Sequence, residues 1–222
     1  MHKSQSQLIQ INNDINSRIK ELNFKDYQPR IIAVSKTFPM DKIKPLIEIG
    51  HQDFGENKVQ EAFEKWSSIK TDNIKLHLIG KLQTNKVKLA VKLFDFIHSV
   101  DNEKLANKIS EEQKKIDKNI KIFIQINLEG EIQKSGIEPK QAESFYNYCS
   151  QKLNLNVVGT MCLPPYGKDP EPYFNRLSEI NKKLKLEDLS MGMSEDYMSA
   201  LKYRATFLRI GSKIFGQRDY PK

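Results

Sequence analysis

The sequence predicts an α/β fold in which one parallel sheet closes into a (β/α)8 TIM barrel, with an extra N-terminal helix before the first strand. Three observations support this prediction. Eight short segments have the composition of buried strands, apolar stripes with helical spacing separate them, and another helical stripe precedes the first strand. Regular alternation is typical of parallel sheets, and the number eight favours closure into a barrel.

The first predicted helix carries apolar residues at spacings of three and four, namely Leu8, Ile11, Ile15, Ile19 and Leu22. The first strand is the run RIIAVS, residues 30–35, which is rich in β-branched residues and lies between two prolines. Seven more strands are predicted, in chain order, at residues 51–56, 76–80, 95–100, 121–127, 156–161, 188–192 and 207–211.

Helical stripes fill the segments between these strands, and the second predicted strand is the weakest by itself. The clearest stripes are Val59, Phe63, Trp66 and Ile69; Val87, Ala90, Val91 and Phe94; Ala142, Phe145, Cys149 and Leu153; and Phe174, Leu177, Ile180 and Leu184. An open, Rossmann-like sheet is the structural alternative. Because no linker rich in Pro, Gly or Ser interrupts the pattern, we predict a single domain over residues 1–222.

Composition narrows the possible partners. The net charge of +8 and pI near 9.2 are compatible with binding to nucleic acid or anionic lipid. However, the lysines lie beside glutamates as on solvated helix faces, and aromatic residues are not interleaved with basic ones. We therefore predict no nucleic-acid and no membrane partner, although the charge would attract a phosphorylated ligand.

Cysteine usage and hydropathy point to a cytoplasmic protein. Cys149 and Cys162 lie far apart and do not form a metal-ligand pair, so no metal is predicted. The N-terminus has no signal-peptide pattern, and no stretch approaches the ~20 apolar residues that span a bilayer.

Polar residues and glycines follow the C-terminal ends of the predicted strands, where barrels place their binding sites. Successive strand side chains alternate between faces, so Lys36 shares a face with Ile32 and Val34. Arg209 likewise shares a face with Phe207 in the eighth strand. Because the first and eighth strands are neighbours in a closed barrel, both cations are expected at the barrel mouth.

Lys36 has two interpretations. It is either a rim lysine whose stem covers apolar neighbours, or a lysine that forms a Schiff base with an aldehyde. A free lysine has a pKa of ~10.4, and burial or a nearby cation such as Arg209 disfavours its charged form. A phosphorylated aldehyde with an aromatic nitrogen facing Arg209 describes pyridoxal 5′-phosphate.

The exit of the eighth strand supplies a candidate phosphate site. Gly211 and Ser212 precede a segment that could begin a helix, and barrels often bind phosphate at this position. Ser194 either contributes a hydroxyl to the phosphate or caps a helix that begins at Glu195.

Five ordered blocks resemble the pyridoxal phosphate homeostasis proteins, single-domain relatives of the alanine racemase barrel. The blocks are AVSKTFP, FGENKVQE, LHLIGKLQTNK, LSMGMSEDY and LRIGSKIFGQRDY, and the resemblance extends from about Arg30 to Tyr220. It implies an internal aldimine on Lys36 and Asn57 beside the cofactor ring. It also implies Arg209 at the pyridine nitrogen and a phosphate site formed by Ser194, Gly211 and Ser212.

The resemblance implies a protein that controls free pyridoxal phosphate without robust catalysis. Apo-enzymes that depend on this cofactor are candidate partners, and we predict a monomer. An arginine at the ring nitrogen weakens the ring as an electron sink. Racemases of the family add a second acid/base, a tyrosine, from a further β-domain, and we expect no such domain in this sequence, which ends soon after its eighth predicted strand. The alternatives are a small amino acid racemase, with Tyr203 or His77 as the second proton-transfer residue, and a cofactor-free aldolase.

Overall fold

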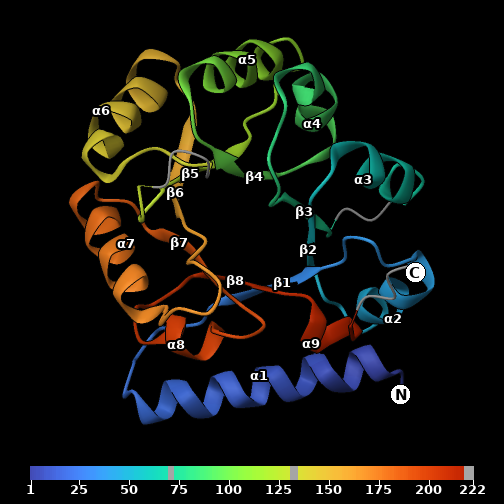
Figure 1. Cartoon of the computed structure of the whole chain (residues 1–222). Coiled ribbons are helices and arrows are strands. Elements are labelled where there is room, and N and C mark those ends of the chain that lie inside the picture. Colours follow the sequence, from blue (N-terminus) through green and yellow to red (C-terminus); the bar gives the residue numbers. More distant parts are fainter. Residues whose placement is uncertain (70–72, 131–134, 218–222) are drawn as a thin grey trace.

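The eight predicted strands form one closed parallel barrel in chain order (Figure 1). The computed structural model describes residues 1–69, 73–130 and 135–217. Each strand pairs with the next, and β8 pairs with β1, which confirms the (β/α)8 barrel and excludes the open sheet. The strands are β1 (Arg30–Val34), β2 (Asp53–Glu56), β3 (Lys75–Leu78), β4 (Phe96–Val100), β5 (Lys121–Gln125), β6 (Asn156–Met161), β7 (Asp188–Met193) and β8 (Phe207–Ile210).

Helices cover the outside of the barrel, and the predicted N-terminal helix packs against α2, α8 and α9 (Figure 1). The described helices do not combine the length and hydropathy needed to span a membrane. The α-helices are α1 (Lys3–Glu21), α2 (Met40–Glu48), α3 (Val59–Trp66), α4 (Val87–Leu93), α5 (Glu103–Lys114), α6 (Ala142–Asn147), α7 (Glu171–Lys183), α8 (Tyr197–Leu201) and α9 (Ser212–Phe215). Short turns of other helix types are η1 (Thr84–Lys86), η2 (Pro139–Gln141) and η3 (Tyr148–Lys152).

The second strand, weakest in the sequence, is stabilised by pairing on both sides. Phe54 lies opposite Ala33 of β1 and Leu76 of β3, and its side chain is fully buried. Four residues are enough for a strand when both neighbours supply hydrogen bonds and the side chain enters an apolar layer. Local sequence could not reveal this support, because both partners come from other segments.

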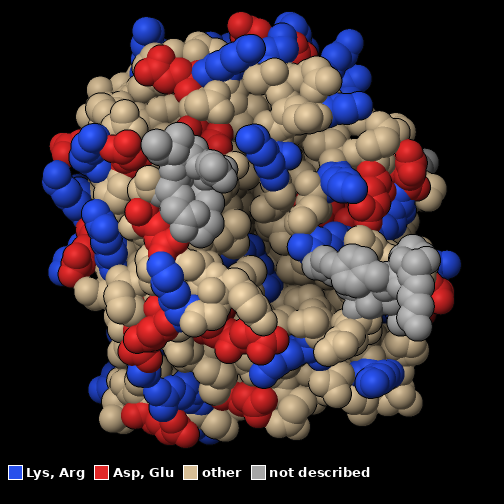
Figure 2. Space-filling model, in the orientation of Figure 1, with Lys and Arg blue, Asp and Glu red and all other residues tan. Residues whose placement is uncertain are grey.

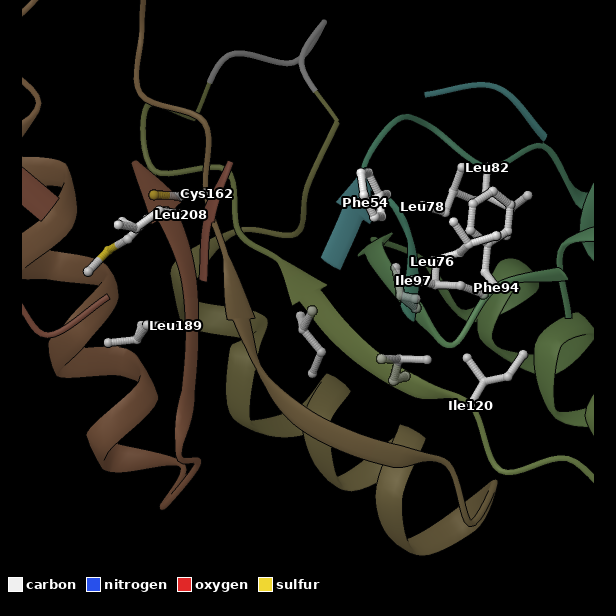
Figure 3. Packing of buried hydrophobic residues seen from close by; sticks show 14 of the residues in the cluster. Phe54, Leu76, Leu78, Leu82, Phe94, Ile97, Ile120, Cys162, Leu189 and Leu208 are labelled. Carbon is white, nitrogen blue, oxygen red and sulfur yellow. The ribbon is translucent and has the colours of Figure 1, made fainter. Parts of the chain in front are cut away.

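Alternation along β1 and β8 separates an inner from an outer apolar layer. Ile32, Val34 and Phe207 pack together in the barrel interior. Leu208 and Ile210 belong instead to the large cluster that joins the sheet to the helices. Leu208 lies between its strand and a neighbouring helix in the close view (Figure 3). The predicted faces are therefore confirmed.

One predicted helical stripe differs in detail. In α3 the buried residues are Val59, Ala62 and Trp66, whereas Phe63 is 41% exposed. Spacings of three and four residues follow one face of a helix through positions 59, 62 and 66. The sequence pattern placed the apolar Phe63 on the buried stripe, but α3 turns the small Ala62 toward the barrel.

Gly192 near the end of β7 provides a test of this packing. It has a φ of 86°, and an added Cβ would lie 2.8 Å from the Cβ of Ala200 in α8. Gly167 has a similar φ of 76° with no atom within 4 Å of an added Cβ. Both alanine substitutions incur the cost of left-handed backbone, about 1–2 kcal/mol. Only Gly192→Ala also overpacks the barrel wall, which adds about 1–3 kcal/mol.

We expect Gly192→Ala to lower the free energy of unfolding more than the Gly167→Ala control does. Urea denaturation followed by circular dichroism measures both. Equal losses for the two variants would contradict the packing described for β7 and α8.

Candidate ligand-binding site

A cavity of about 690 Å³ opens at the C-terminal ends of the strands. The space-filling view is hollowed near the centre of this face, with Lys or Arg atoms visible inside the hollow (Figure 2). The residues predicted as a site come from four separate segments of the chain. All of them line this one cavity, and they are Lys36, Asn57, Ser194, Arg209, Gly211 and Ser212.

Lys36 follows β1 on the inner face, and the backbone just before it is held from several sides. Ser35 N–H donates to the Gly55 carbonyl at 2.9 Å, and Lys65 Nζ donates to the Ser35 carbonyl at 2.9 Å. The buried Ser35 Oγ donates to Glu56 Oε1 at 2.7 Å. Lys36 itself is half-buried rather than enclosed. These contacts therefore fix the backbone position of Lys36, and its side chain lines the cavity.

Glu56 anchors this arrangement behind the barrel wall. Its carboxylate is fully buried, and Oε1 also accepts hydrogen bonds from Lys65 Nζ at 2.9 Å and Trp66 Nε1 at 3.0 Å. The sequence analysis did not predict this role, because it used Glu56 only as part of the block FGENKVQE. An acidic residue at the end of a predicted strand, followed nine residues later by a lysine on a predicted helix, was the available signal.

Asn57 lines the cavity directly after β2, and its backbone lies against Gly80. A Cβ at Gly80 would lie 2.3 Å from the Asn57 carbonyl oxygen, which is closer than any real Cβ contact. Glycine at position 80 therefore permits the two loops after β2 and β3 to touch. This contact fixes the side of the cavity to which Asn57 belongs.

Arg209 is 96% buried, with 4% of its surface exposed, and forms part of the cavity wall. Its NH1 donates to Ser190 Oγ at 2.6 Å, and its NH2 donates to the Cys162 carbonyl at 2.8 Å. Burial lowers the pKa of Arg209, and the acidic group of Asp196 opposes that shift. A guanidinium carries five N–H donors, more than these two bonds use, so it can also donate to a ligand.

Ser194, Gly211 and Ser212 gather on one side of the cavity. Gly211 N–H donates to Ser194 Oγ at 3.3 Å, which joins the loops after β7 and β8. The helix after Ser194 is α8, which begins at Tyr197, so the capping interpretation of Ser194 is wrong. Ser212 is the first residue of α9 and is exposed at the rim, as expected for a hydroxyl that a ligand can reach.

The two candidate proton-transfer residues lie outside the cavity lining. His77 is fully buried within the barrel and hydrogen-bonded, so it is the satisfied core histidine that the sequence suggested. Tyr203 donates to Glu171 Oε2 at 3.3 Å on the helical side. Sequence reasoning missed Tyr173, which lines the cavity and donates to Glu129 Oε1 at 2.8 Å. It lies on a helix without any motif that pointed to it.

Fold and site together define a (β/α)8 barrel protein with a small-molecule site at the C-terminal ends of its strands. The family model "Alanine racemase, N-terminal domain" matches residues 13–219. The pyridoxal phosphate homeostasis protein of Aquifex aeolicus is 37% identical, over 86% of this chain and 88% of the relative. The chain therefore belongs to the pyridoxal phosphate homeostasis proteins within the alanine racemase N-terminal domain family.

Solved structures agree with this assignment. PipY of Synechococcus elongatus PCC7942, solved with PLP bound, is 31% identical, with a TM-score of 0.80 over 91% of this chain and all of PipY. An alanine racemase of Clostridium difficile matches 94% of this chain and 57% of the racemase, with a TM-score of 0.67. At 16% identity that similarity establishes a common fold only.

The anchor behind Lys36 can be tested by removing its carboxylate. We expect Glu56→Ala to lower the free energy of unfolding by about 2–4 kcal/mol, because the buried Ser35 hydroxyl and Trp66 N–H lose their acceptor. The nearly buried Lys65 ammonium also loses the nearer of its two carboxylates and keeps only Glu61, at 3.5 Å. The exposed ion pair of Glu111 with Lys108 provides the control, and Glu111→Ala should cause no measurable change. Chemical denaturation measures both variants, and a Glu56→Ala loss as small as the control would contradict the anchoring role.

Proposed function

We propose that this chain binds pyridoxal 5′-phosphate and takes part in its intracellular homeostasis. The observation that carries the proposal is the convergence of all six predicted residues on one cavity. They come from the ends of β1, β2, β7 and β8, which are far apart in the sequence. The relatives named for this function, and PipY with PLP bound, support the same conclusion.

The side chains around the cavity match the chemical groups of this cofactor one by one. Lys36 offers a primary amine for the aldehyde, and the buried Arg209 offers N–H donors for the pyridine nitrogen. The hydroxyls of Ser194 and Ser212 offer donors for the phosphate, and Gly211 lies beside them in the cavity lining. Asn57 would lie beside the ring. When bound, the cofactor supplies an aldehyde that condenses with amines.

The chain's own residues would orient the ligand from three sides. The loops after β7 and β8 would hold the phosphate, since the Gly211–Ser194 contact already joins them. Arg209 would hold the ring nitrogen unprotonated, because a guanidinium is a donor without an acceptor. The segment held by Ser35 and Glu56 would carry Lys36 to the aldehyde.

The binding proposal predicts a covalent adduct at one lysine. Purified protein incubated with pyridoxal phosphate should gain an absorbance band in the near-ultraviolet or visible region. Borohydride reduction should then fix the cofactor on Lys36, as read by peptide mass spectrometry. Lys36→Ala should lose both signals, since the amine that bonds the aldehyde is gone.

Lys81 supplies the matched control, because it is another lysine that lines the same cavity. Lys81→Ala should keep the absorbance band and the adduct on Lys36. A colourless wild-type protein after incubation, or an adduct on Lys81 in its place, would overturn the proposal.

We also propose that binding and release of the cofactor, rather than turnover of a substrate, is the role of this site. An arginine at the pyridine nitrogen weakens the electron withdrawal that most chemistry of this cofactor needs. The names of the relatives support the proposal, since they describe homeostasis. A small racemase remains the alternative, while delivery to apo-enzymes and a monomeric state remain predictions.

The non-catalytic role predicts no racemisation at ordinary enzymatic rates. Loaded protein should leave L-alanine and D-alanine unchanged during prolonged incubation, as measured by chiral chromatography. An authentic alanine racemase should convert both within the same assay and serves as the positive control. Steady racemisation that disappears in Lys36→Ala would establish the enzyme instead.

A further inference from the structure

A continuous chain of hydrogen bonds crosses the barrel interior, beginning at Arg209. Arg209 NH1 lies 2.6 Å from Ser190 Oγ, which lies 2.8 Å from His98 Nδ1. The other ring nitrogen of His98, Nε2, lies 3.0 Å from His77 Nδ1. His77 Nε2 lies 2.9 Å from Asp53 Oδ1. Five strands, β8, β7, β4, β3 and β2, therefore contribute one side chain each to a single chain.

Aromatic rings enclose this chain of hydrogen bonds. His77, His98 and Ser190 have no exposed surface. The His77 ring stacks on Phe96 with centroids 4.3 Å apart, and the His98 ring stacks on Phe123 at 4.2 Å. In such surroundings water cannot replace a lost partner, so each polar atom depends on its neighbour in the chain.

Donor and acceptor capacities give the chain one direction. Arginine has no acceptor, so Ser190 Oγ must accept from Arg209. The described contacts of Ser190 Oγ offer its hydroxyl proton no acceptor other than His98 Nδ1, which must therefore be unprotonated. A neutral His98 therefore carries its proton on Nε2 and donates it to His77 Nδ1. His77 in turn carries its proton on Nε2 and donates it to Asp53.

The opposite end leads to the same assignment. An ionised carboxylate only accepts, so Asp53 requires a proton on His77 Nε2. Burial raises the pKa of Asp53, but the hydrogen bonds from His77 and Arg30 and the charge of Arg30 oppose that effect, and the pKa lies below its usual value. Both ends thus impose the same proton on each ring.

The electrostatic surroundings also favour neutral rings. Burial lowers the pKa of His77, and the opposing effect of Asp53 does not reverse the shift. Burial lowers the pKa of His98 well below its usual value, and the nearby charge of Arg209 adds to that effect.

We propose that Ser190, His98, His77 and Asp53 are positioning residues for Arg209. They form a one-way hydrogen-bond chain that fixes the guanidinium in the cavity wall and holds both histidines neutral, with the proton on Nε2. Fixing Arg209 leaves its remaining donors in a constant orientation toward the ligand. The constant orientation of Arg209 toward the ligand rests on the proposed function, whereas the hydrogen-bond chain does not.

The protonation pattern can be measured without any ligand. Long-range ¹H–¹⁵N correlation spectra of labelled protein at pH 7 distinguish the two neutral forms of histidine from the charged form. The protein has four histidines. Spectra of the His77→Gln and His98→Gln variants assign the signals of the two buried rings. We expect both to be neutral with the proton on Nε2. A proton on Nδ1 of either ring, or a charged ring, would overturn the proposal.

Two replacements of His98 separate positioning from packing. The amide oxygen of Asn lies near the position of Nδ1, so His98→Asn keeps an acceptor for Ser190. The amide of Gln lies near the position of Nε2, so His98→Gln keeps the contact with His77 but removes the acceptor for Ser190. Both lose the stacking on Phe123 to a similar extent, and a merely structural role would affect them equally.

Affinity for pyridoxal phosphate and the absorbance maximum of the bound form are the readouts. We expect His98→Gln to bind roughly tenfold more weakly than His98→Asn, because it removes the hydrogen bond that orients the Ser190 hydroxyl beneath Arg209. Ser190→Ala should weaken binding similarly, and Ser190→Thr should restore it. Equal affinities and spectra for the two His98 variants would overturn the positioning role. Failure of the wild type to bind the cofactor would overturn the proposed function. The histidine tautomers measured by NMR would still test the hydrogen-bond chain independently.

Discussion

The candidate site depends on the pairing of β8 with β1. This pairing closes the barrel, and its register sets Ile32 opposite Arg209. Lys36 lies four residues beyond Ile32 on the same inner face, so the lysine and the arginine open onto one cavity. In an open sheet with the same strand order these two strands would be the opposite edges, and the amine and the guanidinium would not meet.

Burying an arginine beneath that cavity imposes a second constraint. A cation in an apolar interior is costly unless its donors are satisfied. Among the described residues, the barrel meets this requirement with neutral acceptors, Ser190 Oγ and the Cys162 carbonyl, rather than with a carboxylate in direct contact. A carboxylate at that distance would neutralise the cation and reduce its attraction for an electron-rich ligand atom. Neutral acceptors hold the guanidinium in place and preserve its charge.

The sequence was sufficient for whatever depends on local pattern. Strand positions followed from apolar runs, and the shared inner face of Lys36 and Arg209 followed from alternation. The supports of the site could not be predicted, because they depend on which strands become neighbours across the barrel. His98 and Ser190 are 92 positions apart, and no local feature of either residue indicates the other. The capping interpretation of Ser194 failed for the same reason, because its partner, Gly211, lies on another strand exit.

The length of the interior chain follows from what each of its members requires. Apolar side chains often replace a buried polar network without loss of stability, so stability alone does not explain this one. Once Arg209 lies in the cavity wall, however, Ser190 must accept from it and then needs an acceptor for its own proton. His98 and His77 each accept at Nδ1 and then need an acceptor for the proton on Nε2. An ionised carboxylate ends the series, because it accepts without donating. Asp53 can be that carboxylate because it also pairs with Arg30, whose side chain is 41% exposed. The hydrogen-bond chain therefore extends from the buried Arg209 at the cavity to Asp53, the carboxylate whose partner Arg30 is in contact with water.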